Sequence, residues 1–286
     1  MTQSKPQITV GVLALQGAFS EHVQLLQQAA AALAANRVTD AEWRFTEVRT
    51  PAELDRCDAL IIPGGESTTM SLVASRSGML EPLRDFVKAH RKPTWGTCAG
   101  LILLAESANK TKKGGQELIG GLDVRVERNH FGRQVESFTA ELDLPFLAAT
   151  EAVETKTDKR PFRSVFIRAP VVEKILPHTA GQQAEEATKD GTIVAPSRTP
   201  KDEVARREFD AEVEIMARLP GRAKAWSKFS DATAREIGEE GDIIAVRQGN
   251  VFGTSFHPEL TGDERIHVWW LEQVLAAVSR REELLR

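Results

Sequence analysis

The chain has 286 residues, a formal charge of −4 at pH 7 and a pI near 6.0, so it lacks the basic excess of proteins that bind nucleic acid. Its two cysteines, Cys57 and Cys98, cannot make a disulfide framework, and neither has a second cysteine at metal-ligand spacing. No apolar run is long enough to span a bilayer, and the N-terminus lacks the apolar core of a signal peptide. We therefore expect a soluble cytoplasmic protein that uses no metal, no cofactor and no membrane.

Strands and helices alternate over the first hundred residues. Short apolar segments predict strands at 8–15, 43–48, 58–62 and 92–95. Amphipathic or capped segments predict helices at 22–35, from Pro51 onward and at 80–90, the first of them capped by Ser20. This alternation predicts an α/β fold with a single doubly wound sheet, mixed but mainly parallel, and helices on both faces. In such sheets ligands bind beyond the carboxyl ends of the strands.

The second half of the chain begins with strands that have no helices between them. After Gly120-Gly121, antiparallel additions to the same sheet are predicted at 123–127, 136–142 and 164–170. Two later strands, 243–246 and 251–256, are joined through Gly249-Asn250, which is typical of a hairpin turn. A final helix at 263–285 is expected to pack on the sheet.

The segment 178–242 is the least regular part of the sequence. It combines blocks of mixed charge with scattered prolines, and we interpret it as a surface insertion, mostly loop with one short helix. Residues 213–216 fit either the continuation of a helix or the start of a strand. We expect residues 1–286 to form one domain that carries this insertion.

Cys98 lies between glycines where an apolar strand meets an apolar helix, in Gly96-Thr97-Cys98-Ala99-Gly100. A tight strand-to-helix turn with small neighbours is the geometry of a nucleophile elbow, and a helix N-terminus favours the reactive thiolate. Taken alone, Cys98 fits a buried core cysteine as well.

Two loops carry groups suited to binding anions. Pro63-Gly64-Gly65 follows a buried strand, where paired glycines can turn backbone N–H groups toward an oxygen, although a loop can need glycine for its turn alone. The polar loop 128–134 holds Arg128 and Arg133, which could clamp a carboxylate or merely solvate a surface.

A cysteine at an elbow needs a base, and a group that orients this base. Of the six histidines, only His257 ends a buried strand and is followed two residues later by a carboxylate, Glu259. His22 and His267 lie in amphipathic helices and receive no role. A lone His-Pro-Glu sequence also occurs by chance, but together with the elbow it predicts a Cys-His-Glu site.

Three of these motifs, in this order, resemble those of class I glutamine amidotransferases, the Cys-His-Glu glutaminases: Pro63-Gly64-Gly65, Gly96-Thr97-Cys98-Ala99-Gly100 and His257-Pro258-Glu259. Five longer blocks resemble one branch of that family, the glutaminase subunits of pyridoxal 5'-phosphate synthase, which makes vitamin B6. The blocks are 13–22, 63–70, 128–134, 166–170 and 254–261. The resemblance covers residues 8–177 and 243–286.

The resemblance implies a class I glutamine amidotransferase fold and hydrolysis of L-glutamine to L-glutamate and ammonia. The ammonia would pass through a tunnel to a separate (β/α)8 synthase subunit, and Gln16 would lie where the two subunits meet. Cys98 would be the nucleophile, His257 the base and then the acid, and Glu259 the orienting carboxylate.

The same resemblance implies an oxyanion hole and a substrate site. The oxyanion hole would consist of the backbone N–H groups of Gly65 and Ala99. The residues implied to hold glutamine are Gly64, Gly65, Glu66, Arg128, Ile167 and Arg168.

The chain departs from the family pattern in two places. The segment 178–242 is much longer than in bacterial members, and His130 stands inside the Arg-Asn-x-Phe-Gly block, where we interpret it as a tolerated variant. Three other functions remain open: a glutaminase serving another acceptor, a non-catalytic regulatory subunit and a cysteine peptidase.

Overall fold

The structure is a computed structural model that describes residues 7–36, 38–110, 116–128, 137–149, 160–219 and 241–284. The strands are β1 (Gln7–Leu13), β2 (Glu42–Val48), β3 (Ala59–Ile62), β4 (Thr94–Thr97), β5 (Ala105–Asn109), β6 (Leu122–Glu127), β7 (Ser137–Leu142), β8 (Phe162–Ile167), β9 (Val171–Ile175), β10 (Thr192–Val194), β11 (Val213–Leu219), β12 (Asp242–Gln248) and β13 (Val251–Thr254). The α-helices are α1 (Phe19–Ala35), α2 (Pro51–Asp55), α3 (Ser67–Arg76), α4 (Leu80–Arg84), α5 (Ala99–Leu104), α6 (Ala184–Ala187), α7 (Glu203–Phe209) and α9 (Arg265–Leu284). Shorter helices are the π-helical turn η1 (Asp85–Ala89) and the 3-10 turns η2 (Pro145–Ala149) and η3 (Pro258–Leu260).

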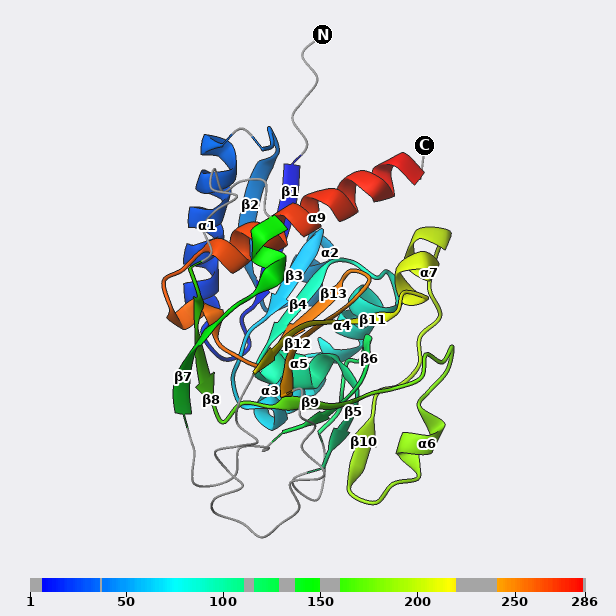
Figure 1. The fold of residues 1–286 in the computed structure, drawn as a ribbon. Coiled ribbons are helices and arrows are strands. Elements are labelled where there is room, and N and C mark those ends of the chain that lie inside the picture. The colour runs from blue at the N-terminus through cyan, green and yellow to red at the C-terminus, as the bar shows by residue number, and fades with distance from the viewer. Residues whose placement is uncertain are drawn as a thin grey trace.

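One mixed sheet organises the described residues (Figure 1). Its strands follow the order β10-β5-β6-β9-β12-β13-β4-β3-β1-β2, and β11 pairs with β12 beside this path. The five strands from β13 to β2 are all parallel, whereas β9, β10, β11 and β12 pair with their neighbours antiparallel. The predicted α/β class and mixed sheet are confirmed.

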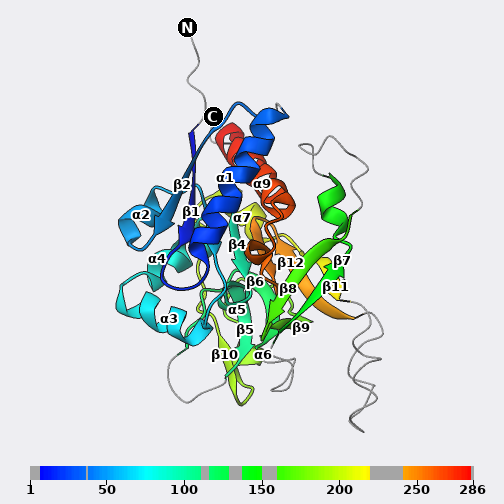
Figure 2. The same ribbon diagram turned by 90° about the vertical axis from the view of Figure 1, so that its left-hand side faces the viewer.

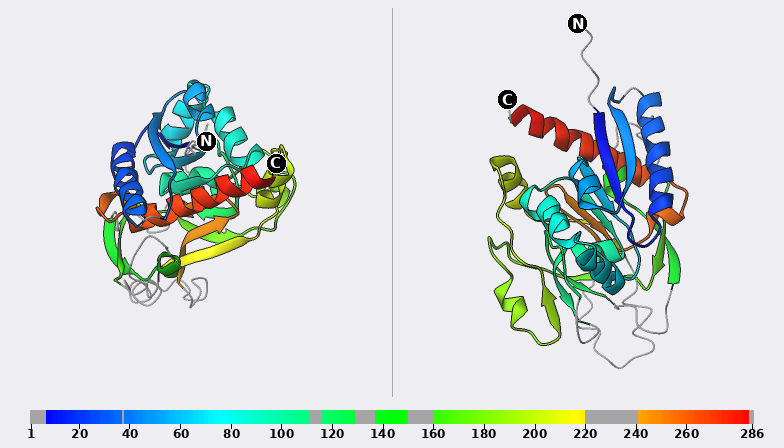
Figure 3. Two further views of the ribbon diagram at one scale, coloured as in Figure 1. Left: turned by 90° about the horizontal axis from the view of Figure 1, so that it is seen from above. Right: turned by 180° about the vertical axis from the view of Figure 1, so that it is seen from behind.

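Helices cover both faces of this sheet because its central strands are apolar on both sides. In β3, Ala59 and Ile61 join a core with α1 and α9, while Leu60 and Ile62 join a second core with α3, α4 and α5. Figure 3 shows α9 on one face and, from behind, α3 to α5 on the other. None of the described helices is long and apolar enough to cross a membrane.

Most predicted elements of the first half occur with small shifts at their ends. The helix predicted at 80–90 is α4 continued by the π-helical turn η1. Thr50 caps α2 with a capping box, and Pro51 is its first residue. The predicted cap by Ser20 is wrong, because α1 begins at Phe19 and Ser20 lies inside it; the N-cap is Ala18, with no side-chain cap. The positive φ of Gly17, 94°, ends the preceding turn there.

The prediction that 136–142 and 164–170 extend the main sheet is wrong. The strands that form there, β7 and β8, pair only with each other as a separate antiparallel ribbon. Exposure alternates along both strands, and Phe162 and Phe166 of β8 pack into the core that also holds residues of α1 and α9. Figure 2 shows the ribbon of β7 and β8 beside α9. The strand that joins the main sheet is β9, which was not predicted.

The described part of segment 178–242 is more regular than the predicted loop. It contains α6, β10, α7 and β11, so residues 213–216 belong to a strand. β10 pairs with β5, and β11 pairs with β12. Two buried cations in and just after η1 also hold the segment: Nζ of Lys88 donates to the carbonyl of Pro196 at 2.7 Å, and Arg91 donates to that of Glu208 at 2.9 Å.

The predicted hairpin near the C-terminus is confirmed. Gln248 of β12 faces Val251 of β13, so Gly249 and Asn250 form a two-residue turn, and Gly249 has a φ of 54°. β13 then runs parallel to β4 and delivers the chain to His257. Strands distant in sequence therefore end side by side.

Candidate active site

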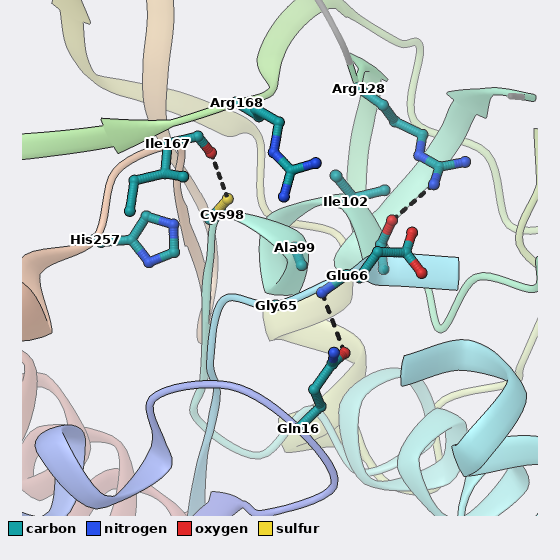
Figure 4. Close-up of a pocket in the computed structure, with 11 residues that line it drawn as sticks. Gln16, Gly65, Glu66, Cys98, Ala99, Ile102, Arg128, Ile167, Arg168 and His257 are labelled. Atoms are coloured by element: carbon teal, nitrogen blue, oxygen red, sulfur yellow. Dashed lines mark hydrogen bonds between the residues drawn. The ribbon is translucent and has the colours of Figure 1, made fainter. Parts of the chain in front are cut away.

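The carboxyl ends of β1, β3, β4 and β13, which we call the rim, open into a pocket of about 360 Å³ (Figure 4). These four strands are parallel neighbours, so the loops that follow them meet at one edge of the sheet. Residues at the ends of β6 and β8 and at the start of α3 also line the pocket. The pocket is lined by Gln16, Gly65, Glu66, Ser67, Cys98, Ala99, Ile102, Arg128, Ile167, Arg168 and His257.

Cys98 lies in the tight turn between β4 and α5. Its backbone has a φ of 49° and a ψ of −103°, a strained combination that clusters at functional sites. The flanking glycines are required, because a Cβ on Gly100 would clash with the carbonyl of Ile62, and one on Gly96 with the backbone of Gly100. Cys98 is 5% exposed, and its Sγ lies 3.9 Å from the carbonyl oxygen of Ile167.

His257 follows β13 and is held by both its backbone and its ring. Its backbone N–H donates to the carbonyl of Val165 at 2.8 Å, and Nδ1 lies 2.8 Å from Oε1 of Glu259. Nε2 is then left for the thiol of Cys98, beside which the ring lies in Figure 4. Burial disfavours the imidazolium, but the bonds to Cys98 and Glu259 outweigh it and raise the pKa of His257 to about 10.

The first glycine of Pro63-Gly64-Gly65 backs this pair. A Cβ on Gly64 would overlap Cε1 of His257 and lie 3.3 Å from Cβ of Cys98. A side chain at this position would therefore displace the imidazole, which explains the glycine physically. Gly64 contacts the pair from behind and does not line the pocket.

The loop after β3 is held at the start of α3 by Glu66. This side chain accepts the N–H groups of Thr68 and Thr69 at 3.1 and 2.7 Å. Partial burial opposes the carboxylate, but the bonds from Thr69 and Thr68 lower the pKa of Glu66 to about 2. The backbone N–H of Glu66 donates to Oε1 of Gln16 at 3.1 Å, and Gly65 lines the pocket between them.

Two arginines face the other side of the pocket. Nη2 of Arg128, at the end of β6, donates to the hydroxyls of Ser67 and Thr68 at 2.8 and 3.0 Å. Burial lowers the pKa of Arg128, and Glu66 opposes this shift. Arg168 follows β8 with a φ of 43° and extends into the pocket in Figure 4. The rest of loop 128–134, with Arg133 and His130, lies outside the described residues.

The structure thus brings the proposed site residues to one place, except Arg133, which lies outside the described residues. Ala99 and Ile167 line the pocket beside Cys98, and Glu259 lies behind His257. Sequence analysis missed His22, whose Nε2 lies 3.3 Å from Oε2 of Glu259. One signal was available, since His22 stands on the buried face of α1 with Leu25, Leu26, Ala29 and Leu33. In the part of the chain that the structure describes, no three His, Cys, Asp or Glu side chains could hold a metal ion.

Known proteins are similar to this chain in sequence and in fold. A model of the SNO glutamine amidotransferase family matches residues 12–214 and 202–276. A protein of Arabidopsis thaliana named "probable pyridoxal 5'-phosphate synthase subunit PDX2" is 38% identical over 265 residues, which cover 93% of this chain and 85% of that protein. The pyridoxal 5'-phosphate synthase subunit PdxT of Streptomyces avermitilis is 39% identical over 267 residues, covering 93% and 94%.

A solved structure described as a glutamine amidotransferase has a TM-score of 0.59 and 33% identity, and the match covers 93% of this chain and 98% of that one. Fold and sequence together define a glutamine amidotransferase. Within that class, the chain belongs to the SNO glutamine amidotransferase family. The resemblance drawn from the motifs is confirmed.

Proposed function

We propose that this chain is the glutaminase subunit of a pyridoxal 5'-phosphate synthase. It hydrolyses L-glutamine to L-glutamate and ammonia, and it passes the ammonia to a (β/α)8 synthase subunit. The names of its relatives support the assembly, and the alignment of Cys98, His257 and Glu259 supports the chemistry. The assignment includes a cytoplasmic location and neither a nucleic-acid nor a membrane partner.

The first half of the reaction uses the thiolate of Cys98 and the imidazolium of His257. The sulfur attacks the side-chain amide carbon of glutamine, and the carbonyl electrons move onto oxygen. N–H groups of Gly65 and Ala99 stabilise this oxyanion, each contributing about 3 to 4 kcal/mol. Nε2 of His257 gives its proton to the amide nitrogen, the C–N bond breaks, and ammonia leaves a glutamyl thioester.

The second half restores the enzyme. His257, now neutral, takes a proton from water, and the resulting hydroxide attacks the thioester carbon. The C–S bond breaks, glutamate is released, and Cys98 is again a thiolate beside an imidazolium. Glu259 stabilises the imidazolium and keeps its Nε2 directed at the sulfur throughout.

The ends of the pocket suit the α-carbon substituents of glutamine. Arg128 and Arg168 offer guanidinium groups to the carboxylate, while Glu66 and the carbonyl of Ile167 face the ammonium. Gly64 and Gly65 shape the loop under the side-chain amide. Gln16 lies at the mouth of this site, where we place the contact with the synthase.

The experiment is a glutaminase assay with and without the synthase subunit. Cys98→Ser is expected to abolish glutamate release while leaving the fold intact, whereas Cys57→Ser, the matched change at the other thiol, retains it. Wild-type activity is expected to be low until the synthase is added. Unchanged release from Cys98→Ser removes this residue from the mechanism.

The same assay separates the alternatives. Ammonia used by a different acceptor enzyme, with no effect of the pyridoxal phosphate synthase, indicates another amidotransferase. Cleavage of peptides in place of glutamine indicates a peptidase. No turnover of either substrate in the complete assembly indicates a regulatory subunit.

A further inference from the structure

A line of four buried side chains extends away from the thiol of Cys98. Oε1 of Glu259 lies 2.8 Å from Nδ1 of His257, and Oε2 lies 3.3 Å from Nε2 of His22. Beyond it, Nδ1 of His22 lies 3.0 Å from Nε2 of His267. His22 and His267 are fully buried, and they come from α1 and α9, 245 residues apart. The proposed mechanism uses only the first two members of this line.

The charge of Glu259 fixes where the protons are. Burial opposes the carboxylate, but His22 and His257 hold the pKa of Glu259 well below its ordinary range. A carboxylate only accepts, so Nδ1 of His257 donates to Oε1, whereas Oε2 has no hydrogen-bond partner among the described residues and lies within ion-pair distance of Nε2 of His22. The hydroxyl of Thr97, 3.5 Å from Nε2 of His22, is the other polar group at that nitrogen. Both oxygens of Glu259 therefore lie beside an imidazole nitrogen, and a hydrogen on Nε2 of His22 is the donor available to Oε2.

With a hydrogen on Nε2 of His22, the contact between His22 and His267 has one tautomeric arrangement. Nε2 of His22 carries its hydrogen, so its Nδ1 accepts and Nε2 of His267 donates. Burial first, and the ring of His22 second, lower the pKa of His267 well below its usual value, which keeps His267 neutral. Its Nδ1 has no hydrogen-bond partner among the described residues and stays a bare acceptor. The edge of Trp95 closes the site beside both rings.

We propose that His22 is a positioning residue for glutamine hydrolysis, which holds Oε2 of Glu259 so that Oε1 keeps His257 directed at Cys98. Without this donor, one side of a buried carboxylate loses its partner, and the carboxylate can rotate away from His257. His267 acts one step further out, by fixing the tautomer of His22. The inference depends on the proposed function for the reaction it names, but the thiol reactivity it predicts is measurable without glutamine.

The effect on pH dependence has a definite sign. Four groups from four elements surround Glu259: His22 of α1, His257 after β13, His267 of α9 and, through His257, Cys98 after β4. Removing the N–H of His22 raises the pKa of Glu259, and a protonated Glu259 no longer supports the imidazolium. The pH below which the reactivity of Cys98 toward electrophiles falls off is therefore expected to rise.

The experiment compares His22→Leu with His22→Gln, both in a Cys57→Ser background that leaves Cys98 as the only thiol. Leucine fills the site without a donor, whereas the glutamine amide can still donate to Glu259. The rate at which iodoacetamide alkylates Cys98 is measured from pH 4 to 9, together with kcat/KM for glutamine in the complete complex.

We expect His22→Leu to lower kcat about tenfold and to move the acid midpoint of both profiles up by about one pH unit. His22→Gln keeps the midpoint of the parent protein. In a Glu259→Gln background, His22→Leu has no further effect on kcat, because it acts through Glu259. A side chain that only fills the core would lower kcat by the same factor in both backgrounds and would move neither midpoint; that result overturns the proposal.

Circular dichroism and thermal unfolding show whether His22→Leu folds, and a second variant keeps the test possible when it does not. If His22→Leu does not fold, His267→Leu is measured, and it is expected to give a smaller shift in the same direction. An unchanged midpoint in that variant also overturns the proposal. If the parent protein hydrolyses no glutamine while the alkylation midpoint shifts, the proposed function fails and the positioning role stands.

Discussion

Two parts of the molecule bury ionisable side chains, and they differ in what those side chains contact. At the rim, Cys98 and His257 face a pocket, on a backbone strained at Cys98. Between η1 and β5, Lys88 and Glu106 form a buried ion pair at 2.7 Å. Their remaining hydrogen bonds go to backbone atoms. The first arrangement leaves polar atoms available to a ligand, and the second uses them to attach segment 178–219. Burial of charge by itself therefore does not identify a catalytic site.

The largest expected effect tests the rim. Glu259→Gln keeps the shape of the side chain but removes the charge that supports the imidazolium of His257. We expect kcat for glutamine to fall about 10³- to 10⁴-fold, as for orienting carboxylates in other triads, with little change in unfolding free energy. Steady-state glutaminase kinetics in the complex measure this, with Glu264→Gln as the control carboxamide. A fall below tenfold contradicts the orienting role.

The next largest effect is expected at the buried ion pair between Lys88 and Glu106. Lys88→Met leaves Glu106 buried without its partner, and we expect a loss of about 3 to 5 kcal/mol in unfolding free energy with kcat unchanged. Burial already raises the pKa of Glu106, with Lys88 opposing it, so the folded variant binds a proton more readily than the unfolded chain. Its deficit therefore grows as pH rises from 5 to 8.

Urea unfolding at both pH values measures this deficit. The control is Lys189→Met, which removes a surface lysine from its pair with Glu186 and is expected to cost less than about 1 kcal/mol. Equal losses of unfolding free energy in the two lysine variants would show that the buried pair stabilises the fold no more than the surface pair does.

The smallest effect is expected at Glu66, whose carboxylate has both a structural position and a place in the pocket. Glu66 caps α3 and also lines the pocket, and its folded pKa of about 2 lies below the ordinary value of 4.5. The stability it contributes is present above pH 4.5 and is lost as pH falls toward 2. Because Glu66 is exposed, solvent screening keeps this contribution below about 1 kcal/mol. Urea unfolding of Glu66→Gln should differ from that of the parent protein at pH 7 and converge with it near pH 2.

The sequence allowed the parallel half of the fold to be predicted because its signals are local. Each signal depends only on residues that are neighbours in the sequence. Examples are the apolar strands, the glycines around Cys98 and the His-Pro-Glu sequence. The ribbon of β7 and β8 was misplaced because alternation shows that one face of a strand is buried, not which core covers it. β10 was missed because it has only three residues, and residues 213–216 of β11 fitted a helix as well as a strand; only the pairing with β5 and β12 identifies the two strands.

The residues of the candidate site also differ in how far the sequence could predict them. Its residues within motifs could be proposed from sequence, but the contact between His22 and Glu259 depends on how α1 packs beside α9 and η3. Helical periodicity places His22 on the buried face of its own helix and says nothing of what it meets there. The roles of the pocket residues remain those proposed above, open to the kinetic tests.

The order in which the chain is synthesised has a consequence for the reactive sulfur. A ribosome completes β4 and the turn at Cys98 well before it reaches His257, Glu259 and His267, which all belong to the last thirty residues. Until that C-terminal piece docks, the cysteine has neither base nor carboxylate and behaves as an ordinary thiol. In the proposed mechanism, the sulfur therefore gains its base and its orienting carboxylate only after the C-terminal segment has packed beside β4.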